Sequence, residues 1–174
     1  MSPIARRLLS DTAEIGHDGW LTVGGVSVEE LAEEYGTPLF VYDEAHLRAR
    51  CREAVAAFGP DRVIYATKAV LCRAMARLAY DEGLLLDVAT GGELHVALAA
   101  GVPASACVLH GNNKSGAELH EAIGAEVRYI VVDSFDELDR LDVLGATGVG
   151  PTPRVVLRIT PGVHAHTHEF IATG

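Results

Sequence analysis

The amino-acid sequence predicts an α/β protein built on parallel strands. Five apolar runs begin at residues 62, 84, 107, 129 and 154, so successive runs start 22, 23, 22 and 25 residues apart. The runs are continuously apolar instead of alternating, which is typical of strands buried on both faces. Helical patterns fill the intervals between them. Strands that alternate with helices at this spacing indicate a parallel sheet with crossover helices.

The first residues of the chain carry a different pattern. We expect an irregular leader over residues 1–19 and a short hairpin over residues 20–28, turning at Gly24-Gly25. The S-x-x-E signature of residues 27–30 predicts a capping box and the start of a helix. That helix should end at Gly36, because glycine favours the conformation that terminates helices.

A short apolar strand is expected over residues 39–42. Asp43 should then cap a longer helix that extends to about Phe58, with Gly59-Pro60 beyond it.

The five predicted strands and the helices between them follow in strict alternation. The strands are expected at residues 62–66, 84–89, 107–110, 129–133 and 154–159. The helices are expected at residues 71–82, 92–100, 117–123 and 135–144, the first three ending at Gly83, Gly101 and Gly124.

Two architectures fit this alternation, an open doubly wound sheet and a (β/α)₈ barrel of the TIM type. No G-x-G-x-x-G follows the first strand, which weakens the dinucleotide-binding version of the open sheet. The even spacing favours the barrel. A complete barrel needs about 250 residues, so five strands predict a partial barrel.

Composition and charge argue against several partners. The net charge is −10, from 14 Lys and Arg against 24 Asp and Glu, whereas nucleic-acid binding draws most of its affinity from a basic surface. No uncharged apolar run approaches the ~18 residues of a membrane span. Cys51, Cys72 and Cys107 are widely spaced without C-x-x-C, which favours a reducing compartment. With no secretory signal pattern at the start, the prediction is a cytoplasmic protein without nucleic-acid or membrane partners.

A chemically versatile side chain stands at the end of each predicted strand. These side chains are Lys68, Asp87, His110, Asp133 and Arg158. The carboxyl ends of parallel strands open onto one face, where active sites lie. Any one of the five could be polar only because strand ends meet water, but all five together favour a functional site.

Lys68 is one of only two lysines in the chain. Flanked by Tyr65, Ala66, Ala69 and Val70, it is expected to be partly desolvated, which would make its amine more available as a nucleophile. The alternative is a lysine that extends its ammonium into solvent. The second lysine, Lys114, lies in an amide-rich segment and is expected to be hydrated.

Several segments resemble the fold-type III pyridoxal-phosphate decarboxylases. Residues 65–69 (Y-A-T-K-A) resemble the Y-A-x-K-A element that carries the cofactor lysine, and residues 86–94 resemble that family's D-x-A-S-G-G-E-L segment. Residues 36–43, 110–115 and 160–169 are similar to the diaminopimelate decarboxylase branch. Val70 departs from the pattern, because many relatives have asparagine there. The order of the motifs makes the resemblance specific.

The resemblance implies a carbon–carbon lyase with pyridoxal 5′-phosphate bonded to Lys68. Its reaction would be decarboxylation of meso-2,6-diaminopimelate, a small amino-acid substrate, to L-lysine and carbon dioxide, the last step of lysine biosynthesis. The implied cofactor-binding residues are Lys68, Ala66, Asp87, Glu93, His110 and Arg158, and the implied residues of the substrate rim are Asn113 and His168.

The resemblance also implies a domain organisation. Residues 1–43 would belong with a β-domain, and residues 44–174 would form an incomplete barrel. The ring-stacking histidine, the phosphate loop, the partner of the ring nitrogen and the rest of the β-domain would lie beyond residue 174. The full-length protein would be a homodimer. The isolated chain is expected to be inactive, with an exposed outer strand over residues 155–159.

Three alternatives remain open at this point. One is a decarboxylase of the same fold that acts on ornithine or arginine, although residues 110–115 and 166–169 argue against it. Another is a non-catalytic pyridoxal-phosphate-binding homologue. The third is a metal site at His164, His166 and His168, which no second cluster supports, so no metal is predicted.

Overall fold

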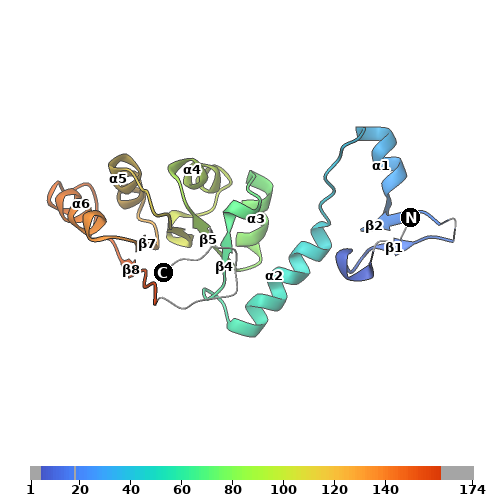
Figure 1. Ribbon diagram of the computed structural model, residues 1–174, viewed down its shortest axis with the longest axis horizontal. Coiled ribbons are helices and arrows are strands. Elements are labelled where there is room, and N and C mark those ends of the chain that lie inside the picture. The colour runs from blue at the N-terminus through green and yellow to red at the C-terminus, as the bar shows by residue number, and fades with distance from the viewer. Residues whose placement is uncertain (1–4, 18, 162–174) are drawn as a thin grey trace. The chain divides into compact units, whose positions relative to one another are not determined.

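The computed structural model describes residues 5–17 and 19–161 (Figure 1). The chain divides into two compact units, Met1–Val63 and Ile64–Gly174. Within the described ranges, no helix is long and apolar enough to cross a membrane.

The first unit contains a three-stranded antiparallel sheet in the order β1 (Glu14–Ile15), β2 (Leu21–Val23) and β3 (Val26–Ser27), after a single 3-10 turn, η1 (Arg6–Leu8). The predicted hairpin is confirmed. Gly24 and Gly25 form its two-residue turn with φ of 61° and 82°, as a hairpin turn of this length requires. The expectation of an irregular leader is wrong for β1, because Glu14 pairs with Thr22 of β2.

Two helices follow, α1 (Val28–Tyr35) and α2 (Glu44–Phe58), both near their predicted bounds. Ser27 caps α1 by accepting the N–H of Glu29 at 3.2 Å, one residue before the predicted position. Asp43 caps α2 by accepting the N–H of His46 at 3.0 Å.

The strand expected over residues 39–42 is wrong. Neither sheet of the described chain includes this segment, and Phe40 is 87% exposed. A strand needs a neighbour for its backbone hydrogen bonds, and an apolar run alone does not supply one.

The second unit is a five-stranded parallel sheet, and all five predicted strands are confirmed. Their order follows the sequence: β4 (Ile64–Ala66), β5 (Leu85–Val88), β6 (Cys107–Leu109), β7 (Tyr129–Val132) and β8 (Val155–Leu157). An open doubly wound sheet reverses its order at a switch point. Consecutive order without a reversal is the arrangement of barrel-type βα units.

Four helices connect these strands and lie along one side of the sheet (Figure 1). They are α3 (Arg73–Asp81), α4 (Gly91–Ala99), α5 (Gly116–Ala125) and α6 (Phe135–Ala146), with 3-10 turns η2 (Thr67–Ala69) and η3 (Ala104–Ala106). Gly124 does not end α5 as expected. The helix continues through it, and Glu126 adopts the left-handed conformation that terminates it, with φ of 61°.

The core lies between the sheet and the helices. Leu86, Leu109 and Ile130 are fully enclosed on the strands, and Leu94 and Leu119 pack on the helices. The outer strand β8 differs, because Leu157 is 59% exposed whereas Leu109 of β6 is fully buried. The apolar side chains of residues 155–159 are therefore exposed, as the sequence predicts.

Candidate functional site

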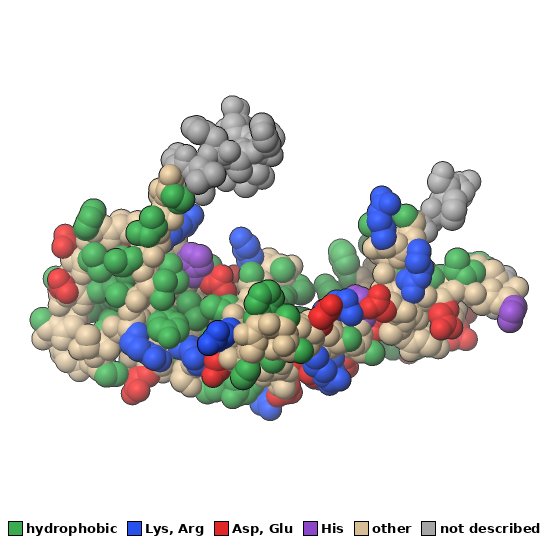
Figure 2. Space-filling model, turned by 90° about the horizontal axis from the view of Figure 1, so that it is seen from below, with side chains coloured by type: hydrophobic (Ala, Val, Ile, Leu, Met, Phe, Trp, Pro, Cys, Tyr) green, Lys and Arg blue, Asp and Glu red, His purple; other side chains and the backbone are tan. Residues whose placement is uncertain are grey.

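The predicted site residues lie at the carboxyl edge of the parallel sheet. Lys68 is in η2 directly after β4, Asp87 is in β5, and His110, Asp133 and Arg158 follow β6, β7 and β8. The face of the molecule seen in Figure 2 carries acidic, basic and histidine side chains among apolar ones. The topology thus brings these five residues to one edge.

Lys68 is exposed, and its expected desolvation is wrong. The strand ends at Ala66, and the chain then makes one 3-10 turn in which Thr67, not Lys68, takes the buried position. The Thr67 hydroxyl donates to the carbonyl oxygen of Asp87 at 2.7 Å and lies 3.1 Å from Glu93 Oε2. Thr67 therefore anchors the turn and leaves the Lys68 amine accessible.

Asp87, Glu93 and His110 form a polar group beside this turn. Nδ1 of His110 lies 3.4 Å from Asp87 Oδ2. Asp87 Oδ1 is buried and has no hydrogen-bond partner within the described part of the chain. Glu93 Oε2 accepts the backbone N–H of Ala89. A buried oxygen without a partner is costly, so Asp87 presents an acceptor to any ligand at this edge.

The remaining predicted residues are more dispersed. Arg158 Nη1 lies 3.4 Å from Asp133 Oδ1. Ala66 ends β4 in a half-buried position, and Asn113 is exposed before α5. His168 lies outside the described residues, as do His164 and His166 of the metal alternative. The described ranges contain no group of three His, Cys, Asp or Glu side chains placed to hold a metal ion.

Cys72 and Cys107 behave differently from each other. Cys72 is exposed and Cys107 is buried, and both are free thiols. Burial raises the pKa of the Cys107 thiol to about 11. The thiolate that a nucleophile requires is therefore disfavoured at Cys107, which is a residue of the buried core.

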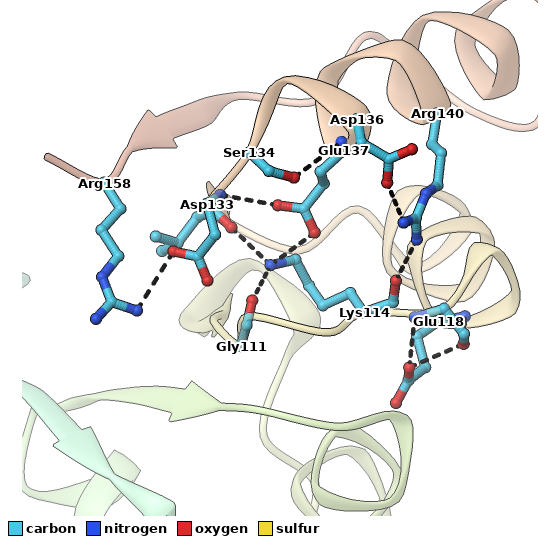
Figure 3. A network of polar contacts seen from close by, with 11 residues as sticks. Gly111, Lys114, Glu118, Asp133, Ser134, Asp136, Glu137, Arg140 and Arg158 are labelled. Atoms are coloured by element: carbon cyan, nitrogen blue, oxygen red, sulfur yellow. Dashed lines mark hydrogen bonds and ion pairs between the residues drawn. The ribbon is translucent and has the colours of Figure 1, made fainter. Parts of the chain in front are cut away.

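Lys114 is the largest departure from expectation. The sequence predicts a hydrated side chain, but only 2% of Lys114 is exposed. Its Nζ lies 2.9 Å from Glu137 Oε1 and donates to the carbonyl oxygens of Gly111 and Val131, the latter at 2.8 Å (Figure 3). The expectation is wrong because amide-rich neighbours in sequence do not determine which groups surround the ammonium in space.

A repeated helix cap, which the sequence analysis did not identify, lies at the carboxyl edge of the sheet. Three helices begin with the signature S/T-x-x-E, and in each the hydroxyl accepts the glutamate N–H at 3.2 Å. The three pairs are Thr90 with Glu93, Ser115 with Glu118, and Ser134 with Glu137. The signature is visible in the sequence and could have identified these glutamates.

Each of these glutamates also reaches the preceding βα unit. Glu93 contacts the Thr67 hydroxyl, Glu118 Oε1 accepts the N–H of Gly91 at 3.0 Å, and Glu137 pairs with Lys114. The Ser115 and Gly91 backbone N–H groups hold the pKa of Glu118 below its usual value. The loops at the carboxyl edge are therefore linked one to the next.

This arrangement suits the chemistry of carbonyl compounds. An accessible primary amine can add to an aldehyde. The carboxylates and the imidazole beside it can bind a cationic group and exchange protons with a ligand.

Comparisons with known proteins identify the family to which the chain is similar. The family model for the pyridoxal-dependent decarboxylase, pyridoxal binding domain, matches residues 44–174. Diaminopimelate decarboxylase of Mycobacterium tuberculosis is 54% identical over 156 residues, which cover 89% of this chain and 35% of the relative. The Bacillus subtilis enzyme of the same name is 48% identical over 170 residues, 95% of this chain and 38% of the relative. The chain spans about a third of the length of these relatives.

Solved structures of decarboxylases share the fold of this chain. Diaminopimelate decarboxylase from M. jannaschii in co-complex with L-lysine superposes with a TM-score of 0.77 at 34% identity, covering 89% of this chain and 37% of that one. The lysine/ornithine decarboxylase from Vibrio vulnificus complexed with putrescine superposes with a TM-score of 0.68 at 25% identity, covering 76% and 35%.

Proposed function

The chain belongs to the family of pyridoxal-dependent decarboxylases, and from that premise we propose that the protein containing it decarboxylates meso-2,6-diaminopimelate to L-lysine and carbon dioxide. The proposed cofactor is pyridoxal 5′-phosphate. The substrate proposal is supported by the relatives named diaminopimelate decarboxylase, which are 47–54% identical to this chain. The activity is proposed for the whole protein, because the chain covers about a third of those relatives.

One observation carries the assignment of the cofactor lysine. The chain has two lysines, and a covalent bond to an aldehyde needs an accessible, uncommitted amine. The amine of Lys114 is buried, and three acceptors surround its three protons. Lys68 is exposed at the carboxyl edge of the sheet. Lys68 therefore fits the reactive end of the cofactor and Lys114 does not.

The neighbouring side chains would hold the cofactor and substrate at the same edge. When bound, the cofactor supplies an electron sink for the electron pair left at the α-carbon after carbon dioxide departs. Asp87, through its unpartnered oxygen Oδ1, can accept a hydrogen bond from a ligand donor. The same carboxylate orients the His110 ring through Oδ2, so that the imidazole can hold or release a proton. Glu93 and Arg158 complete the proposed set at this edge.

The test is an assay of the full-length protein with pyridoxal phosphate. Carbon dioxide release should be at least tenfold faster from meso-diaminopimelate than from L-ornithine or L-arginine. Borohydride reduction followed by peptide mapping should place the cofactor on Lys68 and leave Lys114 unlabelled. A preference for ornithine or arginine would support the alternative decarboxylase. An adduct on Lys68 without any carbon dioxide release would support the non-catalytic homologue.

The domain organisation, assembly and location are part of the same proposal. Residues 1–43 would belong with a β-domain and residues 44–174 with the barrel, which is supported by the start of the family match at residue 44. Limited proteolysis of the full-length protein would test that boundary. In sedimentation, a homodimer would appear as a single species with twice the mass of one full-length polypeptide. The proposed cytoplasmic location would be tested by cell fractionation.

A further inference from the structure

Lys114 is enclosed by a complete set of acceptors. An ammonium has three protons, and its three acceptors are the carbonyl oxygens of Gly111 and Val131 and the carboxylate of Glu137 (Figure 3). The three acceptors come from three places: the loop after β6, strand β7 and the first turn of α6. One side chain therefore joins three elements at the carboxyl edge.

Stability alone does not account for a buried ion pair. Replacing such a pair with apolar groups of similar size is often neutral or stabilising, because burying two charges is costly. This pair is also held rigidly. Glu137 Oε2 accepts the N–H of Asp133 at 3.0 Å, and Arg140 Nη1 donates to the Lys114 carbonyl oxygen at 2.9 Å. The Lys114 ammonium instead fixes a backbone group of the loop after β6 in place.

The group that it fixes lies next to His110. On one side, the Gly111 carbonyl accepts from Lys114. On the other side Gly111 packs against the loop after β5, where a Cβ on Gly111 would come within 2.8 Å of the Ala89 carbonyl oxygen. The N–H of His110 donates to the Val88 carbonyl at 2.8 Å. The backbone is thus held at the N–H of His110, by Val88, and at the carbonyl of Gly111, by Lys114.

We propose that Lys114 is a positioning residue of the site at the carboxyl edge of the sheet: with Glu137, it holds the Gly111 carbonyl and thereby keeps the His110 ring beside Asp87. Lys114 is buried and its ammonium protons are taken up by protein acceptors, so its effect on the reaction passes through His110. The catalytic part of this proposal rests on the proposed function, whereas its geometric part does not.

The test compares two double variants of the full-length holoprotein. Lys114→Met with Glu137→Gln removes both charges of the buried pair and nearly preserves side-chain length. Arg77→Met with Asp81→Asn is the matched control, because it removes both charges of an exposed ion pair on α3 whose atoms lie 2.8 Å apart. A single Lys114 variant is less informative, because it would leave Glu137 buried and unpaired.

The first measurement is hydrogen exchange at the His110 amide, which does not depend on activity. We expect exchange about tenfold faster in the Lys114/Glu137 variant and unchanged in the control. Unchanged exchange in both variants would overturn the proposal. If the protein proved to have no decarboxylase activity, this measurement would still decide the geometric part.

The second measurement asks whether Lys114 acts through His110. We expect the Lys114/Glu137 substitutions to lower kcat/KM about tenfold in the wild-type background and less than twofold when His110→Ala is already present. Equal losses in the two backgrounds would show that the pair acts independently of His110 and would overturn the proposed route.

Discussion

Lys68 and Lys114 occupy comparable places in the fold and have opposite surroundings. Each follows a strand of the same parallel sheet, Lys68 after β4 and Lys114 in the loop after β6. Lys68 is exposed, whereas Lys114 is buried with its ammonium fully paired. A position after a strand therefore does not define a lysine's role. The number of acceptors around the amine distinguishes a reactive lysine from a structural one.

The largest effect is expected from Lys68→Ala. Under the proposed function, this substitution removes the amine that holds the cofactor and should lower kcat on the order of 10³-fold or more. Because Lys68 is exposed, the free energy of unfolding should change by less than about 0.5 kcal/mol. Activity assays with the cofactor, and urea unfolding of the full-length protein without it, would measure the two. A large loss of stability would mean that the lysine is structural after all.

Lys114→Met should have the opposite profile, with a main effect on stability. Glu137 would remain buried without its cation, which should cost about 3–5 kcal/mol of unfolding free energy. Adding Glu137→Gln should recover most of that loss, and both values can be read from urea midpoints. If Lys114→Met alone were neutral, the buried ion pair would make no net contribution to the stability of the fold.

Gly111→Ala should be moderately destabilising. The added Cβ would lie 2.8 Å from the Ala89 carbonyl oxygen, so the loop beside His110 would have to shift, at about 1–3 kcal/mol. Gly124→Ala is the control, because no atom lies near the added methyl group in α5. That variant should be more stable by up to about 1 kcal/mol. Equal effects of the two substitutions on thermal unfolding would argue against tight packing of the loop at Gly111.

The smallest effect is expected from the acid titration of Glu118. Its folded-state pKa is lowered, chiefly by the Ser115 and Gly91 N–H groups. A group of this kind stabilises the fold above its unfolded pKa, about 4.3, and the contribution is lost as the pH falls through the lower folded pKa. The stability difference between wild type and Glu118→Gln should therefore shrink between pH 6 and pH 3. A difference independent of pH would exclude this carboxylate as its source.

The arrangement of the second unit was largely predictable from the sequence. Continuous apolar runs at even intervals predicted β4 to β8, and Asp43 and Gly83 marked helix ends, because these signals are local. The resemblance of residues 65–69 and 86–94 supplied the candidate lysine and its acidic neighbours.

What escaped prediction depends on contacts between distant residues. The acceptors of Lys114 include two backbone carbonyls, which carry no side-chain signal, and a glutamate 23 residues away. Residues 39–42 show the converse, because strand-like composition did not provide a pairing partner. The exposure of Lys68 likewise depends on Thr67 taking the buried position in η2.

The linked glutamates have a consequence for how the polypeptide is made. Each one reaches backwards along the chain: Glu93 to Thr67, Glu118 to Gly91, and Glu137 to Lys114. Every link therefore joins a helix to a segment that is synthesised before it. Domains fold from the N-terminus during translation. These contacts would let each βα unit pack against the preceding unit before the following residues are synthesised.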